Sequence, residues 1–183
     1  MDYPKKETRR HKGLISVLTG NGKGKTSAAF GMALRAAGQG MRVLILQFMK
    51  KRRDTGEIKA IDQMGLPITI KQFGRRVFFR NRTCEAMDIH MAHKGLEAFL
   101  EAVESGSYDL IILDEINMAV DFELLKLEEV MEAIAKKPDQ LHLILTGRNA
   151  KEAILEIADC VTEMKEIKHH YNKGIEAQRG VEF

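Results

Sequence analysis

The sequence predicts a single α/β domain in which a mostly parallel β-sheet is covered by helices on both faces. Short apolar runs, typical of strands buried on both faces, alternate with amphipathic helical segments along most of the 183 residues. No repeat or linker interrupts this alternation, and parallel strands require crossover connections, which helices supply. A chain of this length is sufficient to form one domain with its own core.

The first predicted strand, a glycine-rich loop and the first predicted helix lie between Leu14 and Gly38. Residues 14–18 are mostly apolar, and the pattern becomes helical from Thr26 onward. Between them, glycines at positions 20, 22 and 24 can adopt positive φ and turn successive N–H groups toward one point. The loop ends at a helix N-terminus, where unpaired N–H groups and the helix dipole favour an anion.

The same loop predicts a phosphate-binding site. Gly24, Lys25 and Thr26 supply the end of the motif G-x-x-x-x-G-K-[ST], in which the lysine contacts phosphate and the hydroxyl reaches Mg²⁺. Thr19 replaces the first glycine of that motif. A glycine-rich turn that binds nothing is the alternative, but strand, loop, lysine, hydroxyl and helix all agree. We therefore expect a fold of the P-loop NTPase-like (RecA-like) type.

The other elements follow in order from the same patterns. Apolar runs predict strands over residues 41–48, 67–73, 107–115, 141–146 and 161–167. Apolar residues at spacings of three and four predict helices over residues 57–64, 85–104, 124–135 and 150–158. The polar residues 168–183 resemble a binding loop more than a core element. Ligands bind at the carboxyl ends of parallel strands, so we expect the binding site to lie along one edge of the sheet. It should contain the ends of four strands, at Thr19, Gln47, Asp114–Glu115 and Arg148.

Polar side chains at these strand ends are candidate site residues. Asp114 and Glu115 follow the apolar run 110–113 and are predicted to hold Mg²⁺, directly or through water. Ordinary strand-end carboxylates are the alternative, and which of the two touches the metal stays open. Arg148 is placed for a bidentate contact to phosphate, with a surface arginine as the alternative. Arg35 lies about 2.5 helical turns beyond Thr26 and alone is more typical of a surface or helix-pairing charge.

Two adjacent aromatic residues, Phe78 and Phe79, lie in an arginine-rich loop over residues 74–84. They cannot both face one core from an extended chain. The sequence leaves open whether one of them contacts a large flat ligand or caps the core. No Ser-His-Asp or Cys-His arrangement suggests a protein nucleophile.

The charge distribution separates the N-terminus from the rest of the chain. Residues 1–13 hold five lysines and arginines against two carboxylates, and this excess equals the net charge of +3. We expect residues 1–13 to be a mobile basic tail and residues 14–183 to form the domain. A tail that touches nucleic acid or a phosphate-rich ligand is the alternative. Without an apolar leader, a membrane span or closely spaced cysteines, the chain is predicted to be cytoplasmic and reduced.

Four stretches together resemble the P-loop ATP:corrinoid (cob(I)alamin) adenosyltransferases. They are TGNGKGKTSAAFG (19–31), LILQFMK (44–50), LIILDEIN (110–117), and LTGRNA (145–150) with KHHYNKGIEAQRGVEF (168–183). The resemblance runs in order from about residue 13 to residue 183, and a threonine at the first P-loop position is typical of this family.

This resemblance implies a reaction in which the Co(I) centre of a corrinoid attacks C5′ of ATP. The adenosyl group moves to cobalt and triphosphate leaves, from an ATP bound with its triphosphate reversed relative to ordinary P-loop enzymes. The implied substrates are ATP and cobalamin or another corrinoid, with Mg²⁺ or Mn²⁺ as cofactor. The implied partners are an electron-donating reductase, for instance a flavoprotein, and a second copy of the chain in a homodimer. Neither nucleic acid nor a membrane is an expected partner.

The resemblance also implies roles for individual residues. Lys25 and Glu115 are expected in catalysis, and Glu115 is the favoured metal partner beside Thr26, with Asp114 as the second carboxylate. The residues expected to bind nucleotide are Gly20, Asn21, Gly22, Lys23, Gly24, Lys25, Thr26, Ser27, Arg35, Arg148 and His169. Phe78 and Phe79 lie in the loop whose aromatic residues push the lower axial base from cobalt. Better-known members carry a Trp there, whereas this chain has none.

Two other functions remain as alternatives to the transferase. A P-loop ATPase or kinase would cleave at the γ-phosphate and yield ADP, whereas the transferase yields triphosphate. A non-catalytic carrier of nucleotide or corrinoid would bind without turnover. No water-activating residue stands out for the ATPase, and the transferase is the favoured hypothesis.

Overall fold

The computed structural model describes residues 12–51, 54–75 and 84–183. Within them the centre of the molecule is a six-stranded sheet, in the order β3-β2-β4-β5-β1-β6, and all of its pairings are parallel. The strands are β1 (Ile15–Thr19), β2 (Val43–Phe48), β3 (Ile68–Phe73), β4 (Leu110–Asp114), β5 (His142–Thr146) and β6 (Cys160–Glu163). The predicted parallel α/β architecture is therefore confirmed.

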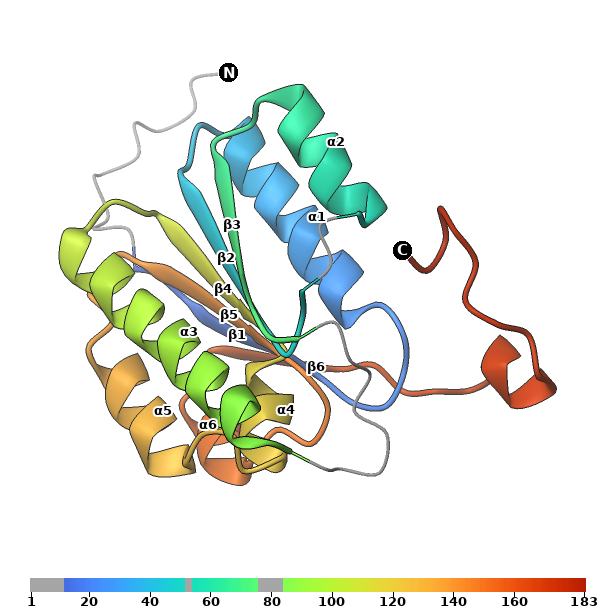
Figure 1. The fold of residues 1–183 in the computed structure, drawn as a ribbon. Helices are drawn as coiled ribbons and strands as arrows, with labels where there is room; N and C mark the ends of the chain where they lie inside the picture. The colour runs from blue at the N-terminus through green and yellow to red at the C-terminus, as the bar shows by residue number, and fades with distance from the viewer. Residues whose placement is uncertain (1–11, 52–53, 76–83) are drawn as a thin grey trace, which may run out of the picture.

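Helices cover both faces of this sheet (Figure 1). They are α1 (Lys25–Gly38), α2 (Gly56–Met64), α3 (Ala86–Ser105), α4 (Ile116–Asp121), α5 (Leu127–Ala135) and α6 (Glu152–Glu156), followed by the 3-10 helix η1 (His170–Lys173). Helices α1 and α2 lie on one face, and α3, α4, α5 and α6 lie on the other. This division follows from the parallel pairing, because each crossover helix must return across one face of the sheet.

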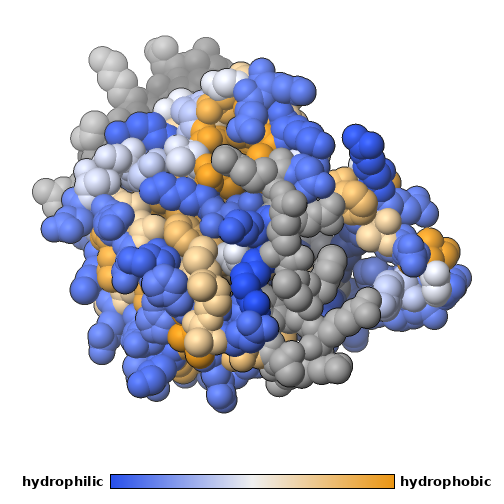
Figure 2. Space-filling view, in the orientation of Figure 1, coloured by the Kyte–Doolittle hydropathy of each residue, from blue (hydrophilic) through white to orange (hydrophobic). Residues whose placement is uncertain are grey.

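Strand β2 shows why the sequence of a central strand is apolar at every position but one. Leu44, Leu46 and Phe48 belong to the core under α3, α4 and α5, whereas Val43 and Ile45 belong to the core under α1 and α2. Successive side chains of a strand point to opposite faces of the sheet. A strand covered on both faces therefore needs apolar residues at both its odd and its even positions. Most of the coloured atoms on the face seen in Figure 2 are hydrophilic.

The described helices also bear on membrane insertion: none combines the length and apolar content that a bilayer crossing requires.

The structure corrects several element boundaries. Strand β4, predicted over residues 107–115, spans Leu110–Asp114. Glu115 adopts a left-handed conformation with φ 66° and is the N-cap of the short helix α4, which was not predicted. The last strand, predicted over residues 161–167, ends at Glu163. Residues 124–126, expected in a helix, precede α5, which begins at Leu127. Of the expected tail, only Lys12 and Gly13 are described, and the Gly13 N–H donates to the Asp139 carbonyl at 2.6 Å.

A prediction about stability arises where α3 crosses β2. A Cβ on Gly95 would lie 2.6 Å from Cε1 of Phe48, a ring with no solvent exposure. The Gly95→Ala variant should therefore lose about 1–3 kcal/mol of unfolding free energy in urea denaturation, because the buried ring has no room to shift. Gly31→Ala in the exposed middle of α1 is the matched control, since a Cβ there meets nothing within 4 Å. It should gain up to about 1 kcal/mol, and equal stability of the two variants would contradict the packing argument.

Candidate active site

The glycine-rich loop joins β1 to α1 at the carboxyl edge of the sheet and is shaped by two close approaches. Gly20 and Gly24 adopt positive φ, of 91° and 113°. A Cβ on Gly20 or Gly22 would lie 2.5 or 2.6 Å from the carbonyl oxygen of Met164, the residue after β6. The Gly22 N–H donates to that same oxygen at 2.6 Å, and the Met164 N–H donates to the Thr19 carbonyl at 2.9 Å. The loop is therefore held against the segment that follows the edge strand.

Lys25 folds back across this loop. Its Nζ donates to the carbonyl oxygens of Gly20 and Gly22 at 2.7 and 2.6 Å, and the residue is only 7% exposed. Burial lowers the pKa of Lys25, and the charge of Arg148 lowers it further, while the carboxylate of Glu115 opposes both effects. A cation is thus present at the position where the motif predicts a phosphate contact.

Asp114 is the centre of a second cluster, and four side chains from different segments donate to it. Thr26 and Thr146 hydroxyls donate to Oδ1 at 3.0 and 2.7 Å. The Gln47 amide and the Lys50 ammonium donate to Oδ2 at 2.9 and 2.7 Å. The sheet register explains the convergence, because Gln47 pairs with Asp114 across β2 and β4. Asp114 has no solvent exposure.

The charges in this cluster shift one another's protonation. Burial alone would raise the pKa of Asp114, but the Lys50 charge and the donated hydrogen bonds lower it. Burial raises the pKa of Glu115, and the neighbouring Asp114 carboxylate adds to that effect. Burial would lower the pKa of Lys50, but the two carboxylates raise it above its ordinary value. Asp114 and Lys50 therefore form an ion pair, with Glu115 Oε1 3.8 Å from the same ammonium.

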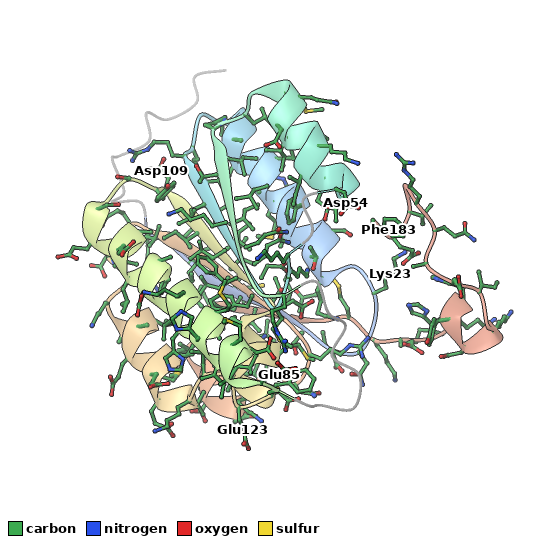
Figure 3. All side chains as sticks on the ribbon, in the orientation of Figure 1. Lys23, Asp54, Glu85, Asp109, Glu123 and Phe183 are labelled. Carbon is green, nitrogen blue, oxygen red and sulfur yellow. The ribbon has the colours of Figure 1, made fainter. Side chains whose placement is uncertain are left out.

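Lys23 connects the loop to the C-terminal segment, toward which it points in Figure 3. Its Nζ forms an ion pair with Glu182 and lies 3.4 Å from the Val181 carbonyl oxygen. Gly22, Lys23 and His169 line a pocket of about 290 Å³ between the loop and residues 165–170. Residues 168–183 are thus brought beside the loop, although they are far from it in sequence.

The remaining predicted residues differ in their distance from this centre. Asn21 and Ser27 are exposed on the loop and at the start of α1, and Arg148 is exposed in the turn after β5. Arg35 lies in the last turn of α1, about 14 Å along the helix from Thr26, so this chain does not bring it into the cluster. Phe78 and Phe79 lie outside the described residues.

Three polar residues of the cluster were assigned no role from the sequence, although Gln47 was expected at the site edge. They are Lys50, Gln47 and Thr146, which donate to Asp114 or to Thr26. A signal was present for two of them, since Gln47 and Lys50 are the polar residues at the end of the apolar run 43–48 and just beyond it.

Comparison with known proteins gives a match over almost the entire chain. The family model described as ATP:corrinoid adenosyltransferase BtuR/CobO/CobP matches residues 11–183. The chain belongs to the ATP:corrinoid adenosyltransferase family. The P-loop and the segment beside it, residues 164–183, both lie within the match.

Individual members of this adenosyltransferase family are similar at moderate identity. A corrinoid adenosyltransferase of Sinorhizobium sp. is 41% identical over 174 residues, which cover 94% of this chain and 81% of the relative. Corrinoid adenosyltransferases of Pseudomonas aeruginosa and Escherichia coli K12 are 36% and 35% identical over 177 residues. These matches cover 97% of this chain and 87% and 89% of the two relatives.

The cluster of this adenosyltransferase has the oxygen chemistry that suits Mg²⁺. Hydroxyl and carboxylate oxygens of Thr26 and Asp114 already surround a cation, the Lys50 ammonium, at 3.0 and 2.7 Å. Within the described ranges no three His, Cys, Asp or Glu side chains gather into a metal cage. Mg²⁺ commonly uses one or two protein oxygens together with substrate phosphates and water. The residues present therefore fit a metal bound together with a nucleotide.

Proposed function

We propose that this protein transfers the 5′-deoxyadenosyl group of ATP to the Co(I) centre of a corrinoid and releases triphosphate. The product is adenosylcobalamin or its precursor. The observation that carries this proposal is the family match over residues 11–183 in a chain whose P-loop and strand-end carboxylates converge at one edge of the sheet. The bond that breaks joins C5′ to the first phosphate oxygen, so the whole triphosphate is the leaving group.

The loop is suited to stabilise that leaving group. As C5′ moves to cobalt, negative charge accumulates on the triphosphate, and preorganised N–H groups and cations lower the free energy of this transition state. The proposed contacts are Gly20, Asn21, Gly22, Lys23, Gly24, Lys25, Thr26 and Ser27, with Arg148 as a further phosphate contact. His169 beside the loop is proposed to contact the nucleotide. Arg35 is also proposed to contact the nucleotide. This contact requires that a nucleotide, either of the same chain or of a second copy, reaches the last turn of α1.

The proposed metal site uses Thr26 and Glu115. Among the described residues, Asp114 accepts four hydrogen bonds from protein groups, so its oxygens are occupied, whereas Glu115 has one ion pair at 3.8 Å. Glu115 is therefore the carboxylate that can turn toward a metal, and Asp114 orients the Thr26 hydroxyl. Bound Mg²⁺ or Mn²⁺ would neutralise part of the charge that accumulates on triphosphate.

Removing the charge of Glu115 should specifically weaken the binding of the metal. In Glu115→Gln, the Mg²⁺ concentration that gives half of the maximal rate should rise about 10- to 100-fold, as for losses of metal-orienting groups elsewhere. The measurement is the adenosylation rate against Mg²⁺ at saturating ATP. Glu123→Gln, an exposed residue in the turn after α4, is the control. The same Mg²⁺ dependence in both variants would contradict the assignment of Glu115.

The corrinoid side of the site is proposed from the sequence. Phe78 and Phe79 are proposed to displace the lower axial base so that Co(I) forms. The double variant Phe78→Ala/Phe79→Ala should give less Co(I) and less product when the reductant is limiting. An unchanged yield of both would remove these residues from the reaction.

Product analysis tests the proposed function directly. The protein is incubated with ATP, Mg²⁺ and chemically reduced cobalamin, and the light-sensitive adenosylated product is followed by its spectrum. The transferase yields triphosphate in equal amount with that product, whereas the ATPase or kinase yields ADP. Orthophosphate release with unalkylated cobalt would refute the transferase.

The setting of the reaction is proposed as well. A separate reductase, for instance a flavoprotein, should supply electrons, because Co(I) must be formed by reduction of a higher oxidation state. We propose a cytoplasmic homodimer with residues 1–13 as a basic tail and residues 14–183 as the catalytic domain. Cys84 and Cys160 are free thiols, which is typical of a reducing compartment.

A further inference from the structure

Lys50 has a fixed backbone and a side chain that bridges the proposed metal ligands. Met49, the preceding residue, adopts a positive φ of 57° and donates its N–H to the Phe73 carbonyl at 2.7 Å. A Cβ on Gly74 would lie 2.5 Å from the Lys50 nitrogen, so the two chain segments pack at backbone distance. The turn aims the side chain at the cluster, where Nζ donates to Thr26 Oγ1 at 3.0 Å and to Asp114 Oδ2 at 2.7 Å.

The position of this ammonium conflicts with the proposed metal. Thr26 Oγ1 is a proposed metal ligand, Asp114 orients that hydroxyl, and Glu115 Oε1, the other proposed ligand, lies 3.8 Å from Nζ. Mg²⁺ binds such oxygens at about 2 Å, so an ammonium about 3 Å from the same oxygens would lie close to a divalent ion. Two like charges at that separation repel strongly. One cation must therefore leave when the other binds.

We propose that Lys50 is an exchangeable internal cation, which occupies the metal site before the nucleotide binds and then contacts the phosphate chain when the metal replaces it. This inference rests on the proposed nucleotide and metal site and adds a residue to it. The lysine stem is flexible and the side chain is 31% exposed, so the ammonium can swing while the backbone stays in place. Phosphate bound beside Thr26 offers new acceptors within reach of the displaced charge.

The exchange predicts opposite effects of one substitution on metal and on nucleotide. In Lys50→Met, Mn²⁺ alone no longer competes with an ammonium, so Mn²⁺ should raise the melting temperature at least about 4 °C more than in the wild type. ATP in EDTA loses a phosphate contact, so it should bind Lys50→Met about 10-fold more weakly by calorimetry. A residue with a merely structural role would not move these two readouts in opposite directions.

Controls separate the exchange from general damage. Lys51→Met removes an exposed charge one residue later and should leave both readouts as in the wild type. Lys50→Arg keeps a cation in the cluster and should show no extra Mn²⁺ stabilisation. Lys50→Gln, whose amide can still donate to Asp114, replaces Lys50→Met if the latter does not fold, with the same expectation.

Two results would overturn the inference. One is equal Mn²⁺ stabilisation of the wild type and the charge-removing variant, and the other is equal affinity of both for ATP in EDTA. Neither measurement contains a corrinoid. If the wild type adenosylates cobalamin while these tests fail, only the role of Lys50 is refuted. If the tests succeed but the wild type does not adenosylate cobalamin, only the proposed transferase is refuted.

Discussion

Lys25→Met is expected to lower kcat/KM for adenosyl transfer about 100- to 1000-fold, the usual cost of removing one group that stabilises developing charge. The stem of Met is similar in volume to that of Lys, so packing in this nearly buried position is retained. What disappears is the ammonium that crosses the loop between the Gly20 and Gly22 carbonyls. In the proposed reaction this charge is needed most as triphosphate departs, so the loss should fall on kcat as well as on ATP binding.

Steady-state rates with chemically reduced cobalamin measure this effect without the reductase. Lys23→Met is the comparison on the same loop, since Lys23 is exposed and paired with Glu182 in the free protein. It should lose less than about 10-fold, in the range of a surface charge contact. If Lys25→Met kept more than about a third of wild-type kcat/KM while Lys23→Met fell further, the Lys25 ammonium would not be the principal charge on triphosphate.

Asp114→Ala is expected to cost about 3–5 kcal/mol of unfolding free energy, because it removes one partner of a buried ion pair. The Lys50 ammonium, the Gln47 amide and the Thr146 hydroxyl would each lose the acceptor they share. Such losses are large because unpaired polar groups remain desolvated in the folded state.

Urea denaturation of four proteins tests the pairing. They are the wild type, Asp114→Ala, Lys50→Met and the double variant that carries both substitutions. The double variant should be less destabilised than the sum of the two single variants, because removing both charges leaves neither unpaired. Glu115→Gln, one residue along the chain, should lose less than about 1 kcal/mol, since its one ion pair among the described residues is at 3.8 Å. Simple additivity of the two single variants would show that they do not interact.

The strands and the loop were predictable because their signals are local. Residues 43–48 and 110–114 are apolar runs that only strands covered on both faces require, and the structure has strands there. The loop motif also contains its own geometry, since the glycines and the lysine that folds over them lie within six residues. Helix α4 was missed because its six residues are fewer than the window in which periodicity is recognised. Its N-cap, Glu115, has no sequence signal, because positive φ is typical of Gly or Asn.

The role of Lys50 could not be predicted because its partners are distant in sequence. They lie 24 and 64 residues away, at Thr26 and Asp114, and meet only through the strand order of the sheet. From the sequence alone, the charged residues 50–56 could face either phosphate or solvent. The contact that decides between them depends on the register of β2 against β4, which local patterns do not determine.

The backbone bonds between Met164 and the residues Thr19 and Gly22 carry a practical consequence for protein engineering. The anion cradle is assembled from two pieces of chain that are more than a hundred positions apart, and only one of them contains the recognisable signature. A graft of that signature alone onto a foreign scaffold would lack its supporting wall.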